Sequence, residues 1–144
     1  MTGEPVPVPD ADTQPFWDAA ERRRLVVPRC RACRFWIWQP KPVCPRCHAD
    51  SPTWEPVGGV ARVVSWTVLH PPLLPAFAEH APFAVLLVEI MFDGTGTGVR
   101  MLGPLVDETG TPVRTDGRDL SIGAPVVVRW RVQDDVVVPA WGLT

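Results

Sequence analysis

The sequence contains no tyrosine, only one lysine, and no apolar run that is long enough to span a bilayer. Its N-terminus has neither a basic start nor an apolar segment, so we expect no secretory signal peptide and a cytoplasmic location. The motifs of a nucleophile elbow, a zinc-protease helix and a phosphate-binding loop are also missing. None of the three histidines, His48, His70 and His80, lies in a nucleophile motif. We therefore expect neither a membrane span nor catalytic residues in this chain.

Proline and glycine, by contrast, are abundant, with 18 and 11 residues in a chain of 144. These residues favour turns and short strands over long helices. The length is that of one medium domain, or of a small module attached to one. Hydrophobic residues make up 46% of the chain, so we expect a packed globular core.

All four cysteines lie in one short stretch, as two C-x-x-C pairs that are separated by ten residues. Cys30 pairs with Cys33, and Cys44 pairs with Cys47. Each pair can place two thiolates on one metal, and together the pairs complete a tetrahedral zinc shell. Because a catalytic zinc keeps one position open, four protein ligands favour a structural site that holds a single zinc ion.

Other interpretations of the cysteines stay open at this level. Iron can replace zinc in a site of four thiolates. Disulfides are disfavoured because nothing in the sequence directs the chain to an oxidising compartment, and redox motifs usually place one C-x-x-C before a helix. His48 follows Cys47 directly and is a candidate substitute ligand. An exposed loop histidine is the favoured interpretation, because the cysteines already complete the shell.

Charge is unevenly distributed along the chain. Residues 22–46 contain eight basic residues and no acidic one, whereas residues 51–144 contain six basic and ten acidic residues. Four thiolates around one Zn²⁺ carry a net negative charge, which balances only part of the basic charge. The metal-binding region is therefore basic and the remainder of the chain is acidic.

The pattern of the sequence divides the chain into four parts. These are a flexible lead-in (1–14), an N-terminal helix (15–27), a zinc ribbon (28–52) and a barrel domain (53–144). The helix itself is predicted over residues 15–25, because Pro15 suits a first helical turn and basic residues lie near its end. In the ribbon we expect strands over 25–29 and 35–38, with a linker over 50–54 leading into the barrel.

The barrel domain is predicted from alternating apolar residues, which are typical of half-buried antiparallel strands. The five predicted strands are 60–70, 83–92, 99–106, 124–133 and 136–141. A polar connection over 107–122 has room for one helical turn, and the glycine-rich residues 93–98 read as a hairpin loop. Five strands with a long connection between the third and fourth indicate an OB-type barrel. The predicted fold class is therefore mainly β, with a short N-terminal helix, a zinc ribbon and a five-stranded OB-fold barrel.

Six large apolar residues are candidates for a partner-binding surface. They lie in the predicted helix, in the ribbon, and in a proline-rich loop after the first barrel strand: Phe16, Trp17, Trp36, Trp38, Leu73 and Leu74. Outward-facing aromatic and leucine side chains of this size would suit an interface. Packing on the chain's own core, or a loop that folds over the barrel mouth, stays open as the alternative.

Several motifs occur in an order that resembles the DUF35 family, over roughly residues 15–141. The motifs are Phe16-Trp17, Cys30-Arg31-Ala32-Cys33, Pro42-Val43-Cys44-Pro45-Arg46-Cys47, Gly59-Val60-Ala61-Arg62-Val63-Val64-Ser65-Trp66-Thr67-Val68-Leu69-His70 and Ile122-Gly123-Ala124-Pro125-Val126-Val127-Val128. The resemblance implies an OB fold with a rubredoxin-like zinc ribbon, in which the four cysteines hold the metal. It also implies a non-catalytic accessory subunit that binds a thiolase-superfamily enzyme acting on acyl-CoA thioesters.

By the same resemblance, the partner is a thiolase, an acyltransferase or a steroid side-chain aldolase, and the small subunit can help to form its acyl-CoA site. The alternative is a nucleic-acid-binding protein, because zinc ribbons and OB barrels both serve that function. Single-strand binding needs a basic groove with stacking aromatic residues. The predicted barrel has a net charge of −4 from its six basic and ten acidic residues, which makes nucleic acid the less favoured partner.

Overall fold

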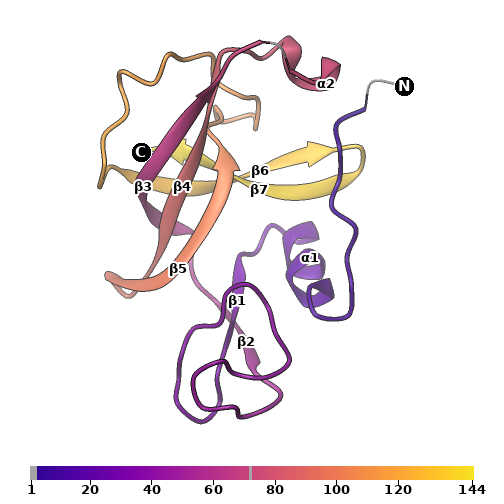
Figure 1. The fold of residues 1–144 in the computed structure, drawn as a ribbon, viewed down its shortest axis with the longest axis vertical. Coiled ribbons are helices and arrows are strands. Elements are labelled where there is room, and N and C mark those ends of the chain that lie inside the picture. The colour runs from indigo at the N-terminus through magenta and orange to yellow at the C-terminus, as the bar shows by residue number, and fades with distance from the viewer. Residues whose placement is uncertain (1–2, 72) are drawn as a thin grey trace.

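The computed structural model describes residues 3–144 except residue 72, and the regular secondary structure of this part is mainly β-strand (Figure 1). Its elements are α1 (Gln14–Glu21), β1 (Val26–Arg29), β2 (Thr53–Pro56), β3 (Val60–Leu69), α2 (Pro75–Ala78), β4 (Phe83–Phe92), β5 (Thr95–Pro104), β6 (Pro125–Gln133) and β7 (Val136–Leu143). Met1 and Thr2 of the predicted lead-in, and Pro72 of the proline-rich loop, lie outside the described residues. No helix among the described residues is long and apolar enough to cross a membrane.

The larger sheet is antiparallel and has the strand order β5-β4-β3-β6-β7. Its two ends come together at one point, where Leu105 forms a parallel bridge with Trp141 and the Val106 N–H donates to the Trp141 carbonyl at 2.9 Å. The sheet therefore curls into a partly closed barrel whose long connection lies between β5 and β6. This arrangement confirms the predicted OB fold.

The core forms because alternate side chains of each strand point inward. In β4 these are Ala84, Leu86, Val88 and Ile90, and each is 0% exposed. Trp141 of β7 is also fully buried and belongs to the same cluster. Burial of one such large apolar side chain contributes about 1.5–3 kcal/mol, so this inner face supplies much of the barrel's stability.

Helix α1 lies against β7 and β1 and buries Phe16 and Ala20. The turn before it is fixed by Asp10 and Thr13, each of which accepts a hydrogen bond from the other's backbone N–H through its side-chain oxygen. The helix ends at Glu21, earlier than predicted. Arg23 adopts a left-handed φ of 56°, which a helix cannot contain.

Several predicted details are corrected by the structure. The predicted linker over 50–54 is in part a strand, because Thr53 and Trp54 pair with Arg29 and Pro28 in the small β1–β2 sheet. The predicted strand over 35–38 makes only one bridge, between Trp36 and Arg29. The short strand pairing is explained by the ribbon's tight turns, which redirect the chain after each cysteine pair.

Three loops also differ from expectation. The connection over 107–122 contains turns and isolated bridges and no helical turn, whereas the proline-rich loop forms the short helix α2. The glycine-rich residues 93–98 do lie in a hairpin, but only Asp93 and Gly94 form its turn, since β5 already begins at Thr95. Both residues of this turn have positive φ, as a tight hairpin turn requires.

We predict that Gly103→Ala destabilises the barrel. An added methyl group would lie 2.8 Å from Trp141 Nε1 and 3.3 Å from the Pro139 carbonyl oxygen, so the buried indole would have to shift. The expected loss in the free energy of unfolding is about 1–3 kcal/mol, measured by urea denaturation. The neighbouring Leu102, which is 69% exposed, supplies the control, because Leu102→Ala should change stability by less than about 0.5 kcal/mol. Equal midpoints for Gly103→Ala and the wild type would contradict this packing.

Candidate metal centre and its surroundings

The two C-x-x-C turns share one backbone geometry, fourteen positions apart in the sequence (30 to 44). In the first turn, Arg34 N–H donates to the Cys30 carbonyl at 3.2 Å, and Cys30 N–H donates to the Phe35 carbonyl at 2.9 Å. The equivalent bonds of the second turn are His48 N–H to the Cys44 carbonyl (3.0 Å) and Cys44 N–H to the Ala49 carbonyl (2.8 Å). The ribbon is therefore built from two matching knuckles that face each other.

The equivalence of the two knuckles explains the conformation and the exposure of His48. The residue after each second cysteine has a left-handed backbone, with φ of 63° at Arg34 and 64° at His48. Both side chains are exposed. His48 is thus the turn residue of its knuckle and lies outside the cysteine cluster, which confirms the interpretation of an exposed loop histidine.

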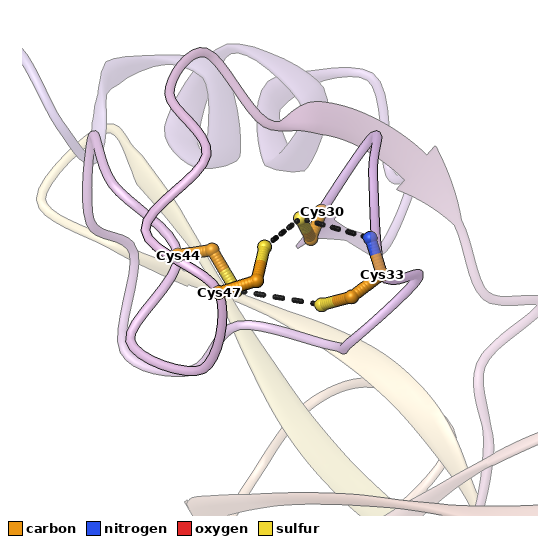
Figure 2. A group of neighbouring side chains, drawn as sticks. All are labelled: Cys30, Cys33, Cys44 and Cys47. Carbon is orange, nitrogen blue, oxygen red and sulfur yellow. Dashed lines mark hydrogen bonds between the residues drawn. The ribbon is translucent and has the colours of Figure 1, made fainter.

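The four sulfur atoms converge between the knuckles (Figure 2), where all of them lie within 4.8 Å of one another. Cys30 Sγ is 3.4 Å from Cys47 Sγ, and Cys33 Sγ is 3.7 Å from Cys44 Sγ. Zinc–sulfur bonds of about 2.3 Å in a tetrahedron require sulfur–sulfur distances of about 3.8 Å. The geometry of the donor atoms therefore fits one metal ion, and the four cysteines are positioned to bind it.

Backbone N–H groups are directed at the sulfur atoms from within each knuckle. Cys33 N–H donates to Cys30 Sγ, and Arg46 N–H donates to Cys44 Sγ, both at 3.4 Å. The bond from Cys33 is the main reason why the pKa of the Cys30 thiol is lowered to about 6. The N–H of Phe35 lowers the pKa of Cys33, but burial and the neighbouring thiols outweigh this effect and raise it to about 11. A bound divalent cation would stabilise all four thiolates.

The aromatic stretch of the ribbon connects the cluster to the barrel. Ile37 is 0% exposed and packs with Cys30 and Cys44 on the metal side. The flanking tryptophans turn the other way, toward the body of the chain: the ring of Trp36 lies 5.1 Å from that of Phe92. The side of this stretch opposite the metal therefore packs on the chain's own barrel.

A similar contact joins the ribbon to helix α1. Trp38 lies 5.4 Å from the ring of Phe16, which in turn meets Trp17 edge-on at 4.9 Å. Phe16 is only 5% exposed, whereas Trp17 and Trp38 are half-buried and pack against the core cluster. In the chain by itself, this pair of aromatic contacts holds the helix and the ribbon together.

Arg29 strengthens the same junction. Its guanidinium lies 4.3 Å above the ring of Trp36, donates to the Arg34 carbonyl at 2.8 Å, and is paired with Glu55 at 3.4 Å. Arg34 also pairs with Glu55, at 2.9 Å. Because these ion pairs are partly exposed, each adds little stability, and the stacking on Trp36 is the firmer contact.

The basic charge of residues 22–46 is thus partly neutralised within the chain. Arg29, Arg31 and Arg34 each have a carboxylate partner, Arg31 through Asp50 at 3.3 Å. The remaining basic residues of this segment are exposed and have no ion pair among the described residues: Arg22, Arg23, Arg24, Lys41 and Arg46. They leave a basic surface on and beside the ribbon.

The two candidate leucines lie far from the metal, in the loop before α2. Leu74 precedes this helix and is 61% exposed, and Leu73 is half-buried. The chain after α2 is fixed by Arg114, which donates to the carbonyl groups of Glu79 and Ala81. The structure therefore presents Leu74 on an anchored loop, separate from the aromatic cluster.

One feature was not predicted from the sequence. A groove of about 690 Å³ lies between β5, β7, helix α1 and the ribbon. Its apolar walls include Trp17, Trp38, Leu87 and Leu102. These residues come from four separate segments, so no local pattern in the sequence indicates that they meet.

We predict that freshly purified protein contains about one equivalent of zinc and that Cys33→Ser abolishes metal retention. Because the ribbon has little apolar core of its own, loss of the ion should lower the melting temperature on the order of 10 °C. Elemental analysis and thermal unfolding measure both effects. His48→Gly is the matched control, since it keeps the turn and should retain the metal. Less than about half an equivalent of zinc or iron in the wild type would contradict the site.

Comparison with known proteins follows the same division of the chain. Residues 17–53 match the family model described as the rubredoxin-like zinc ribbon domain of ChsH2, and residues 54–131 match the model of the ChsH2 C-terminal OB-fold domain. The chain is 35% identical over 132 residues to a "Probable enoyl-CoA hydratase alpha subunit" of Thermomonospora curvata, covering 90% of the chain and 36% of that protein. It is 27% identical over 89 residues to a "DUF35 domain-containing scaffold protein" of Methanocaldococcus jannaschii, covering 60% and 58%. The chain thus spans only about a third and just over half of these two relatives.

Solved structures extend the similarity to the whole fold. A chain of the "Ltp2-ChsH2(DUF35) aldolase" superimposes with a TM-score of 0.80 and 31% identity, covering 96% of this chain and 98% of that one. A DUF35-family protein of unknown function from Sulfolobus solfataricus shares the fold, with a TM-score of 0.60 and 12% identity over 93% and 86% of the two chains. With its four-cysteine ribbon and its OB-fold barrel, the chain belongs to the ChsH2 group of the DUF35 family.

Proposed function

We propose that the chain is a non-catalytic accessory subunit that binds a thiolase-superfamily enzyme acting on acyl-CoA thioesters. The observation that carries this proposal is the near-complete, two-way overlap with a chain of the Ltp2-ChsH2(DUF35) aldolase, at 31% identity. Overlap of 96% and 98% makes the two chains comparable as whole units. The partner, whether a thiolase, an acyltransferase or a steroid side-chain aldolase, supplies the catalytic residues.

The metal centre supports a scaffold function. All four ligand positions of a tetrahedral ion are supplied by cysteines, so the ion has no open position for a substrate or a water molecule. Its effect is to hold the two knuckles together and thereby to position Ile37, Trp36 and Trp38. In this proposal the ribbon presents a surface to the partner, and chemistry takes place in the partner.

The basic surface of the ribbon supports a contribution to the acyl-CoA site. Arg22, Arg23, Arg24, Lys41 and Arg46 are exposed and have no carboxylate partner among the described residues. Arginine and lysine side chains of this kind suit the phosphate groups of coenzyme A. We therefore place a CoA thioester at the interface, beside the ribbon.

The candidate partner-binding residues divide into two groups in this proposal. Trp17, Trp38, Leu73 and Leu74 retain exposed area and contact the partner directly. Phe16 and Trp36 pack within the chain and hold the contact surface in position. Tryptophan is enriched in interface cores and among the residues that contribute most to binding, and exposed leucine adds apolar area to be buried.

We predict that the chain co-purifies with the thiolase-like enzyme encoded beside it when only one partner is tagged. The enzyme alone should show reduced activity on its acyl-CoA substrate, and the chain alone should show none. Leu74→Asp should weaken the complex about tenfold or more, because it buries a charge at the interface. Val8→Asp is the matched control, since Val8 is 88% exposed on the lead-in and should leave binding unchanged. Failure to co-purify, or full enzyme activity without this chain, would refute the proposal.

A further inference from the structure

The groove lies at the place where the barrel fails to close. Strands β5 and β7 are the two ends of the sheet, and they meet at Leu105 and Trp141. From that point the strands diverge, and helix α1 lies below the opening (Figure 1). Residues 100–104 of β5, together with Val138 and Pro139 of β7, line the groove between them.

The hydrogen-bond register shows which backbone groups of β5 face this groove. Leu105 N–H donates to the Ala84 carbonyl. Because hydrogen-bonded pairs alternate along an antiparallel ladder, the backbone N–H and C=O groups of Gly103 and Met101 also bond to β4. Arg100 and Leu102 lie in the intervening, non-bonded pairs with Glu89 and Leu87. Their N–H and C=O groups therefore point away from β4, into the opening. Among the described residues, no backbone hydrogen bond from another segment reaches them.

Proline limits the length of this free edge on both sides of the groove. Pro104 of β5 and Pro139 of β7 occupy positions whose backbone faces the opening, and neither has an N–H to donate. Proline on a sheet edge blocks indiscriminate pairing with other strands. The stretch from Arg100 to Leu102 is left as a short edge that can accept one strand of a few residues.

The groove lining is mostly apolar, with one basic side chain, Arg100, and two acidic ones, Asp10 and Asp12 of the lead-in. Leu102 is 69% exposed, and it lies with Leu87, Trp17 and Trp38 around the groove. Arg100 is exposed at the rim and has no ion pair among the described residues. An extended segment with an apolar residue over Leu87 and an acidic residue beside Arg100 would complement both features.

We propose that an extended, apolar segment of the partner enzyme occupies this groove and adds to the edge of β5 as a further strand. Arg100 and Leu102 would together form about four backbone hydrogen bonds with it, as in strand addition to other exposed sheet edges. The inference rests on the proposed function for the existence of the partner. It goes beyond that function in naming the edge that binds, the conformation of the bound segment and the charge beside it.

Hydrogen–deuterium exchange tests the backbone contact directly. In the isolated chain, the amides of Arg100 and Leu102 should exchange quickly, because they have no acceptor. In the purified complex their exchange should slow by about tenfold or more. The amides of Met101 and Gly103, which already bond to β4, are the internal reference and should change much less. Unchanged exchange at 100 and 102 in a formed complex would overturn the inference.

A pair of substitutions at one position separates the backbone from the side chain. Leu102→Ala removes the apolar contact and keeps the N–H, whereas Leu102→Pro removes both. Since the β4 ladder does not use this N–H, Leu102→Pro should fold, as urea denaturation can verify. It should weaken binding about tenfold relative to Leu102→Ala, and Arg100→Glu should also weaken it. Equal affinities for the alanine and proline variants would overturn strand addition.

The outcomes also separate this inference from the proposed function. Failure of the wild-type chain to bind the enzyme refutes both. Binding without protection at Arg100 and Leu102 refutes only the strand addition. Protection that appears in the isolated chain as its concentration rises would assign the groove to a second copy of this chain, and would overturn the partner segment as its occupant.

Discussion

The convergence of four sulfur atoms is the constraint on which the ribbon depends. Between Cys30 and Ala49 the fully buried apolar side chains are few, namely Ile37 and the cysteines Cys30 and Cys44. A cluster this small cannot offset the conformational entropy lost on ordering some twenty residues, which costs about 1–2 kcal/mol per residue. A metal ion that joins the two knuckles supplies the missing free energy. The direction of Trp36 and Trp38 therefore depends on the metal as much as on their own packing.

A small set of contacts fixes the position of the metal-dependent ribbon on the barrel. The β1–β2 pair leads out of the ribbon, and Val57 N–H donates to the Leu25 carbonyl at 3.1 Å where the two segments meet the barrel. The stacking of Arg29 on Trp36, and of Trp36 against Phe92, fixes the ribbon on β4. One wall of the groove belongs to the ribbon and α1, and the other to β5 and β7. The shape of the groove is thus set by this junction.

Features that depend on local spacing were predictable from the sequence, and features that depend on distant contacts were not. The C-x-x-C spacing identifies the four ligands, and alternation places β4 and β6 nearly to the residue, whereas β5, predicted over 99–106, runs from Thr95 to Pro104. Strand β2 looked like a linker because its pairing partner, β1, lies some twenty residues earlier. Helix α1 ends early, at Glu21, because Arg23 has a left-handed backbone that no residue preference of arginine would indicate. The sequence leaves open whether the ribbon tryptophans face a partner or the chain's own core, because only packing decides that they lie against the barrel.

The groove between β5 and β7 is a compromise between complete closure of the barrel and a free strand edge that can bind another chain. Complete closure of an OB-type barrel would pair the backbone of Arg100 and Leu102 with β7 and leave nothing for another chain. A long open edge would instead attract any unpaired strand during folding. Here Leu105 and Trp141 close one end, the prolines at 104 and 139 block the positions beside it, and α1 covers the opposite side. What remains is too short to form a stable pair through its backbone alone. An occupant must also fill the space between Trp17, Trp38 and Leu87, so selectivity comes from the side chains that surround the edge.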